Sequence, residues 1–226
     1  MPRAVAKPPK VKEVDAWTDE QVGRFLIVST DHRWAVAFRL GVLYGLRRSE
    51  ALALKWDDLD TTKGTLRIDE GLVAVSKGAV WSEAKNARSR RVIPLDDETL
   101  RALARHRKEQ AEERLAAGPT WEDHDLVIAT HVGRPVMPRS LDRALESLVE
   151  EAGLPRLTSH GLRHTAATHM VRGATDVGEL RAVADMLGHS PDMLMKVYAH
   201  ALPESTRAIA DRIGQRNRTA EVPRVV

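Results

Sequence analysis

The sequence predicts a mainly α-helical protein with a small antiparallel β-sheet, an α+β fold. Long segments carry apolar residues at the spacing of amphipathic helices and are bounded by capping signals. Between residues 65 and 95, short runs instead alternate apolar and polar residues, as half-buried strands do. Hydrophobic residues make up 42% of the 226 residues, which is enough for one large domain with a sizeable core.

The chain is expected to divide into an arm, one domain and a tail. Residues 1–14 are rich in lysine and proline and lack apolar periodicity, which is typical of a linker-like basic arm. Residues 15–214 contain the predicted helices and strands and form the expected domain. Residues 215–226 are expected to be a disordered tail.

The first helices are predicted by their caps. Residues 18–21, Thr-Asp-Glu-Gln, form a capping box, so a helix is expected to begin there. A second helix, over residues 32–44, is apolar on more than one face and is expected to be buried. The segment 45–50 ends it, and Ser49 is expected to cap a short third helix that reaches Trp56.

Strands and a long helix are predicted in the middle of the chain. A small antiparallel sheet of about three strands is expected from the alternating runs at 65–69, 72–76 and 91–95. Asp96 then opens a long amphipathic helix that Gly118 and Pro119 end. Residues 125–130 are expected to be a short strand or an extended segment.

Helices are predicted for most of the remaining chain. They are expected at 140–153, 160–172, 177–187, 191–199 and 203–213. Gly188 ends the third of these helices, and Ser190 caps the next with Pro191 at its first position. The side chain of His189, at this junction, is therefore expected to be held rigidly by two helices.

The composition excludes several classes of protein. The chain has no cysteine, which excludes disulfides and cysteine-based zinc or redox sites. No apolar run is long enough to cross a bilayer and the N-terminus does not resemble a signal peptide, so a cytoplasmic protein is expected. The net charge of +3 does not by itself indicate nucleic acid, and the basic cluster at residues 85–91 alone is typical of a solvated face.

A ligand site is suggested by two histidines and an arginine on one predicted helix. His160 and Arg163 are three residues apart, so they share a face and fit a phosphate group. A metal site is an alternative, because His160 and His164 are four residues apart. However, Gly161 stands where a zinc hydrolase has its glutamate. Taken alone, the pattern also fits a capped helix with one buried and one solvated histidine.

Several short motifs are spaced along the chain. Residues 45–50 read Gly-Leu-Arg-Arg-Ser-Glu, residues 160–163 read His-Gly-Leu-Arg and residues 187–189 read Leu-Gly-His, and Tyr198 stands nine residues after His189. In combination these motifs resemble the tyrosine recombinase family, which includes the phage integrases. They match its boxes Gly-Leu-Arg-x-Ser-Glu, with its arginine at Arg47, His-x-x-Arg and Leu-Gly-His, and Tyr198 stands where the family has its nucleophile.

The resemblance covers residues 17–213 and implies a tyrosine recombinase catalytic-domain-like helical fold. It nominates Lys85, which precedes a basic strand-forming segment, as the catalytic lysine, although Asn86 follows it where many relatives have threonine. Family members normally carry a separate N-terminal core-binding domain. The linker-like arm at that end implies a catalytic domain from which the core-binding domain is absent.

The resemblance also implies a reaction, namely cleavage and rejoining of double-stranded DNA through a 3′-phosphotyrosyl intermediate, with no metal and no cofactor. The phenol of tyrosine is a poor nucleophile at neutral pH, so the reaction needs a proton acceptor and a positive field at the phosphate. The matched positions imply these roles: Tyr198 as nucleophile, Arg47, Arg163 and His189 as phosphate ligands, His160 as general base, Lys85 as general acid and Glu50 as support for Arg47 or His160.

Assembly and alternatives follow from the same resemblance. The family recombines DNA as a tetramer, and a monomer is expected when the protein is free of DNA. The expected location is the bacterial cytoplasm, with association to the nucleoid when DNA is bound. A type IB topoisomerase-like enzyme would use the same groups as a monomer. A catalytically silent DNA-binding module is disfavoured because every chemical position is filled, and a protein-interaction helical domain would be favoured only without DNA affinity.

Overall fold

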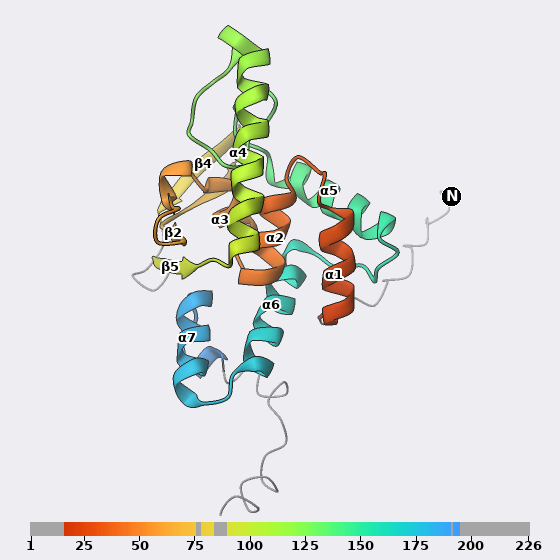
Figure 1. Cartoon of the computed structure of the whole chain (residues 1–226), viewed down its shortest axis with the longest axis vertical. Coiled ribbons are helices and arrows are strands. Elements are labelled where there is room, and N and C mark those ends of the chain that lie inside the picture. The colour runs from red at the N-terminus through yellow and green to blue at the C-terminus, as the bar shows by residue number, and fades with distance from the viewer. Residues whose placement is uncertain (1–15, 76–77, 84–89, 191, 195–226) are drawn as a thin grey trace, which may run out of the picture.

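The computed structural model describes residues 16–75, 78–83, 90–190 and 192–194 (Figure 1). Side chains are described for these ranges except at 74–75, 78–80 and 82–83. Several predictions therefore lie outside the described residues: the arm, the tail, the helix at 203–213, most of the helix at 191–199, Lys85 and Tyr198. Within the described part of the chain, no helix is long and apolar enough to cross a membrane.

The centre of the fold is helix α2 (Ala35–Tyr44), which is buried on most sides. Helix α1 (Asp19–Val28) lies beside it, and α6 (Ser159–Gly173) packs along it (Figure 1). The predicted capping box of α1 is confirmed, since Thr18 accepts from the amide of Gln21 and donates its own amide to the Gln21 side chain. Burial of α2 follows from its composition, because an apolar helix without a polar face is stable only inside a core.

The third helix differs from its prediction at both ends. Helix α3 (Arg48–Ala53) has Arg47, not Ser49, at its N-cap position. The amide of Arg47 donates to the carboxylate of Glu50 at 2.8 Å, so the side chain at the third helical position satisfies the amide of the N-cap residue, and the N-cap side chain itself makes no capping hydrogen bond. The helix also ends before Trp56, which begins a 3₁₀ turn, η1 (Trp56–Asp58).

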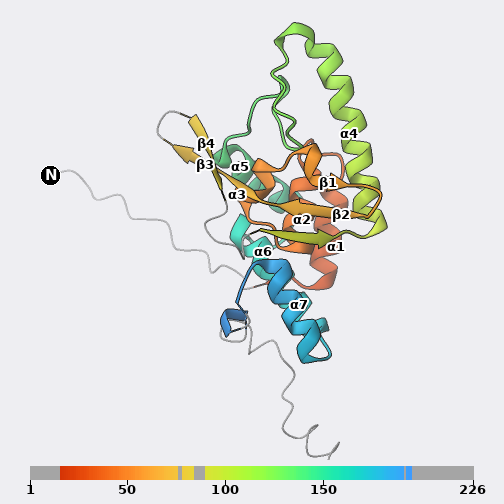
Figure 2. The same cartoon turned by 90° about the vertical axis from the view of Figure 1, so that its left-hand side faces the viewer.

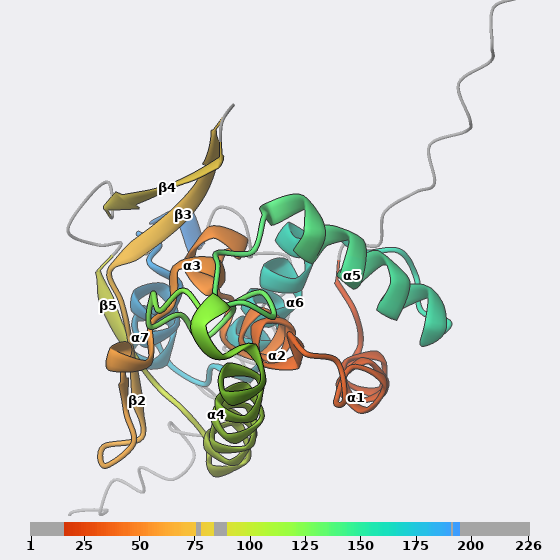
Figure 3. The same ribbon diagram turned by 90° about the horizontal axis from the view of Figure 1, so that it is seen from above.

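The predicted antiparallel sheet is present, but one strand was assigned wrongly. Strands β1 (Leu59–Asp60), β2 (Thr65–Ile68) and β5 (Arg91–Pro94) form it in the order β1-β2-β5. Strand β3 (Glu70–Val75) instead pairs with β4 (Gly78–Glu83) in a separate hairpin beside α3 (Figure 3). Short runs reveal strands but not partners, because pairing depends on the turn and on what each face covers.

The long helix α4 (Asp97–Ala117) begins at the predicted cap Asp96 and ends at Gly118, where η3 (Gly118–Thr120) follows. It buries only Thr99 and Leu103, and its C-terminal half projects beyond the core (Figure 2). The segment 125–130 forms no strand: Leu126 and Ala129 make isolated bridges, Asp125 has a φ of +55°, and the chain bends at 127–128, so the predicted strand or extended segment is only partly present.

Helices α6 and α7, which carry the second and third boxes, lie in the lower half of the molecule (Figure 1). Helix α5 (Pro138–Glu151), which overlaps the predicted helix at 140–153, buries Leu141, Leu145 and Leu148. Helix α7 (Val177–Leu187) packs against α6 and β5, and with α6 it encloses a small second cluster of apolar residues. Gly188 ends α7 in the left-handed conformation, and Ser190 accepts from the amide of Met193, so both predicted caps are confirmed.

Candidate active site

Five of the predicted site residues are described, and three helical segments supply them. Arg47 and Glu50 lie at the start of α3, His160 and Arg163 lie in the first turns of α6, and His189 follows α7. The charges that act on His189 are those of Arg163, Arg47, Arg91 and Glu50, so the structure gathers four of the five around one point. His160 is exposed at the start of α6, where it lines a groove together with Arg47.

Glu50 is the centre of this group. Its side chain is buried, and it binds Arg47 through the backbone amide at 2.8 Å and the guanidinium at 2.7 Å. It also receives two parallel hydrogen bonds from Arg91, at 2.9 and 2.8 Å. Burial alone would raise the pKa of Glu50, but the hydrogen bonds and charges of Arg91 and Arg47 outweigh it and lower the pKa to about 2. The carboxylate is therefore ionised throughout the physiological range.

Arg91 is a site residue that the sequence analysis did not select. It lies in a basic cluster whose ordinary interpretation is a solvated face, yet only 8% of it is exposed. The alternation of β5 explains this, because Arg91 and Ile93 point to the buried face while Val92 points to solvent. That register was readable in the sequence, and an arginine two residues before a core isoleucine was the available signal.

Arg163 is buried still more deeply, at 3% exposure. Its terminal nitrogens donate to the backbone carbonyls of Gly45 and Leu187, and one of them contacts Nε2 of His189 at 2.8 Å. The close approach requires a glycine at position 45, where φ is +69° and an added Cβ would lie 2.5 Å from a methyl carbon of Leu187. The Gly-Leu-Arg box and the His-x-x-Arg box are thus joined directly at this glycine.

His189 is a neutral hydrogen-bonding group in this environment. Burial and then the positive charges of Arg163, Arg47 and Arg91 lower its pKa to about 4. A guanidinium can only donate, so Nε2 accepts from Arg163 and the neutral ring carries its proton on Nδ1. At neutral pH this histidine is therefore uncharged and carries its proton on the buried Nδ1.

The depressed pKa of His189 predicts a pH dependence of stability. Because the folded-state pKa, about 4, is below the ordinary 6.5, the unfolded chain binds the extra proton between these values. The free energy of unfolding should therefore fall as pH is lowered from 6.5 to 4. Denaturant unfolding of His189→Gln at several pH values should show a shallower fall than the unchanged protein.

Comparing the pH dependence of unfolding in the unchanged protein and in His189→Gln isolates the contribution of His189, because His32, His106 and Glu50 titrate in both proteins. Burial lowers the pKa of His32 and of His106, and Glu50 contributes its own loss of stability only as pH falls from about 4.5 towards 2. Identical pH dependence in the two proteins would show that His189 is not shielded as the structure describes.

A groove adjoins the buried group at the start of α6. It has a volume of about 620 Å³ and is lined by Arg47 and His160 together with Arg48, Arg156 and the hydroxyl groups of Thr158 and Ser159. Thr158 caps α6, so the positive end of that helix dipole faces the groove. The arginines at its rim are paired with carboxylates of α5, Arg48 with Asp142 and Arg156 with Glu146. The side chains of Arg48 and Arg156 could therefore exchange these carboxylates for phosphate groups, next to the buried arginines, whose positions are fixed.

The metal alternative has little support from the histidines themselves. His169, on the same helix as His160 and His164, contacts the backbone carbonyl of Trp17 at 2.7 Å and the carboxylate of Asp19 at 3.0 Å. Among the described residues, no three histidine, aspartate or glutamate side chains gather as a metal site requires. What the described site offers is three arginines, one carboxylate and a neutral histidine, which together favour an anion.

Comparison with known proteins identifies the protein family to which the chain is similar. The profile described as "Phage integrase family" matches residues 17–205. A XerC-like tyrosine recombinase of Caldanaerobacter subterraneus is 28% identical over 87% of this chain and 53% of its own length. Tyrosine recombinase XerC of Mycobacterium sp. (strain KMS) is 31% identical over 74% of this chain and 49% of its own. The chain therefore spans about half the length of these curated relatives.

Solved structures show the same fold. The integrase of transposon Tn1549, in a complex with transposon right-end DNA, has a TM-score of 0.74 and 22% identity, over 92% of this chain and 69% of that one. The match of fold agrees with the predicted catalytic-domain-like helical architecture. On the family match over most of its length, the chain belongs to the phage integrase family of tyrosine recombinases.

Proposed function

We propose that residues 15–214 form the catalytic part of a site-specific DNA recombinase that cleaves and rejoins strands through a 3′-phosphotyrosyl link. The observation that supports this most directly is the group of Arg47, Arg91 and Arg163 around His189, in which Glu50 binds Arg47 and Arg91. Two of these three guanidinium groups are buried, so their charge is weakly screened and already in place before DNA binds. Such a site stabilises the charge that builds on a phosphate in its transition state.

Each proposed role uses a property of the residue. Arg47, partly exposed beside the groove, contacts the phosphate directly, while Arg163 is held by two carbonyls and so contributes a fixed charge beneath it. His189 donates a hydrogen bond in its neutral form. His160, exposed at the first turn of α6, takes the proton of Tyr198 as general base.

The remaining chemistry falls to residues outside the described ranges. The oxygen of Tyr198 attacks phosphorus and displaces the 5′-oxygen, which Lys85 protonates as it leaves. The phosphodiester bond is exchanged for a phosphotyrosyl ester, so attack by another 5′-hydroxyl reverses the step without a cofactor.

The proposed partner is double-stranded DNA, whose backbone would pass along the groove at the start of α6. Phosphates there can replace Asp142 and Glu146 as partners of Arg48 and Arg156. The solved integrase of Tn1549 is bound to DNA, which supports this partner. We further propose that four copies assemble on DNA from free monomers, in the bacterial cytoplasm and at the nucleoid.

The experiment that tests the function is covalent capture. The protein is incubated with a suicide duplex that loses its 5′-hydroxyl strand after cleavage, and the adduct is digested and its peptides are sequenced by mass spectrometry. The expected result is a nucleotide attached through a 3′-phosphate to the peptide that contains Tyr198. An adduct on Tyr44, which is the other of the two tyrosines, or on any other residue would contradict the assignment.

A further inference from the structure

A single buried guanidinium, that of Arg91, connects three elements of the site. It lies at the start of β5, and its two terminal nitrogens donate to both oxygens of Glu50 on α3. Its Nε donates at 2.7 Å to the carbonyl of Met186 in the last turn of α7. Planar guanidinium geometry suits this arrangement, because a fork of two parallel bonds and a third bond leave the group no rotational freedom.

The first connection leads to Arg47. Glu50 is bound by Arg47 and Arg91 from two sides, and its position decides where the Arg47 guanidinium lies. Arg91 binds both oxygens of this carboxylate from a buried position, and its hydrogen bonds and charge lower the Glu50 pKa. Without Arg91, the carboxylate would be buried against a single partner that is itself partly exposed.

The second connection leads to His189. Arg91 holds the carbonyl of Met186, and Arg163 holds the carbonyl of the next residue, Leu187. Two buried cations at the C-terminal end of a helix also complement its dipole. The last turn of α7 is therefore fixed to β5 on one side and to α6 on the other, and His189 follows directly after it.

We propose that Arg91 is a positioning residue for strand cleavage: through Glu50 it fixes Arg47, and through the last turn of α7 it fixes His189, without contacting DNA itself. The proposal rests on the proposed function of the site. A positioning role and a purely structural role make different predictions. Displacing a reacting group by about 1 Å can lower the reaction rate on the order of a hundredfold while DNA affinity is maintained, whereas a purely structural role affects only the stability of the fold.

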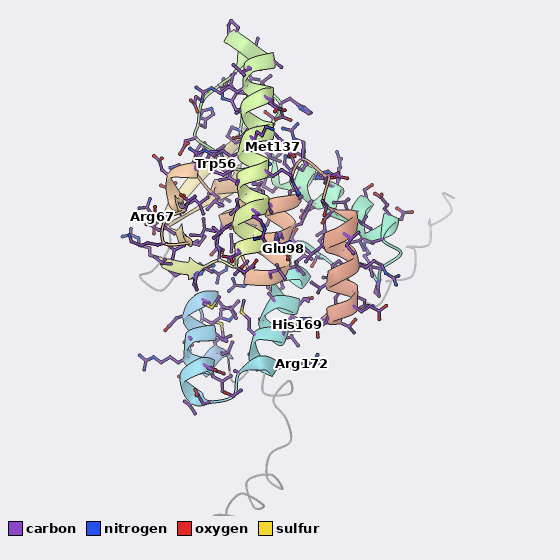
Figure 4. All side chains as sticks on the ribbon, viewed as in Figure 1. Trp56, Arg67, Glu98, Met137, His169 and Arg172 are labelled. Carbon is purple, nitrogen blue, oxygen red and sulfur yellow. The ribbon has the colours of Figure 1, made fainter. Side chains whose placement is uncertain are left out.

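The variant that tests this is Arg91→Met, with Arg67→Met as its matched control. Arg67 lies on the neighbouring strand β2, and its side chain points outward to ion pairs with Asp58 and Asp69 (Figure 4). The single-turnover rate of adduct formation and the Kd for duplex are measured at a temperature where circular dichroism shows both variants folded. We expect Arg91→Met to lower the rate by at least about tenfold, with Kd changed less than about threefold. Arg67→Met should retain the original rate.

Arg91→Lys provides the rescue that separates positioning from packing. A lysine keeps the positive charge, but its ammonium group cannot bind Glu50 and the carbonyl of Met186 together. A cleavage rate between those of the unchanged protein and Arg91→Met is therefore expected. Equal rates for Arg91→Met and Arg67→Met would overturn the proposal. A fall in DNA affinity as large as the fall in rate would also overturn it, because that result indicates a direct contact or a damaged fold.

A double-mutant cycle that measures the Kd for duplex DNA tests the same proposal without relying on cleavage. Arg47→Ala is expected to weaken duplex binding, and it should weaken binding by a smaller factor in the Arg91→Met background, where Arg47 is no longer held in place. Equal factors in the two backgrounds would refute the positioning role. If the unchanged protein forms no adduct at all, the proposed function fails, while this cycle still decides the role of Arg91.

Discussion

Replacing Tyr198 by phenylalanine is expected to abolish the covalent protein–DNA adduct. The substitution removes only the phenolic oxygen, and no other hydroxyl is proposed to attack the phosphate. Affinity for duplex should be maintained, because the cations at the groove and the buried site make the phosphate contacts. A denaturing gel after incubation with the suicide duplex measures the adduct, and fluorescence anisotropy of a labelled duplex measures the affinity.

The chain provides a matched control at Tyr44. Its hydroxyl donates to the carboxylate of Asp96 and accepts from the Asp96 amide at 2.9 Å, so this phenol is committed to capping α4. Burial, as the largest influence, raises its pKa further above the ordinary 10. Tyr44→Phe should lower stability and leave the adduct intact. An adduct that persists in Tyr198→Phe, or that disappears in Tyr44→Phe, would refute the choice of nucleophile.

The helical part of the fold was predictable because its signals are local. The capping box at Thr18, the cap Asp96 and the glycine at 188 each act within one turn, and the structure has a helix boundary at each of them. Strand pairing was not predictable in the same way. The run at 72–76 leaves the sheet and forms a hairpin with a strand, β4, that is not among the predicted runs.

The site was predictable through its motifs but not through its supporting contacts. The sequence selected Arg47, Glu50, Arg163 and His189, and the structure brings them together. It did not select Arg91, because the partner of that residue lies 41 positions away in the chain. A basic residue on a strand is ordinarily solvated. Arg91 is buried because it shares the inner face of β5 with Ile93 and because a buried carboxylate, that of Glu50 on α3, pairs with its charge.

Replacing Arg163 by lysine is expected to lower the rate of strand cleavage by about a hundredfold or more. A lysine retains the charge, but its single ammonium cannot reach the carbonyls of Gly45 and Leu187 and the ring of His189 together. Single-turnover adduct formation with saturating protein measures the rate. Arg172→Lys is the control, since it makes the same change at an exposed position of the same helix (Figure 4).

Arg163→Met separates the charge of this residue from its geometry. Arg163 is the first of the charges that lower the pKa of His189, after burial, so its removal should raise that pKa from about 4 towards the ordinary 6.5. Two carbonyls would also lose a buried donor, so the free energy of unfolding should fall by about 1–3 kcal/mol for each. NMR titration of the imidazole in a variant that remains folded measures the pKa. An unchanged pKa would mean that Arg47 and Arg91 dominate the field at His189, and the proposed role of Arg163 as the fixed charge beneath the phosphate would then be wrong.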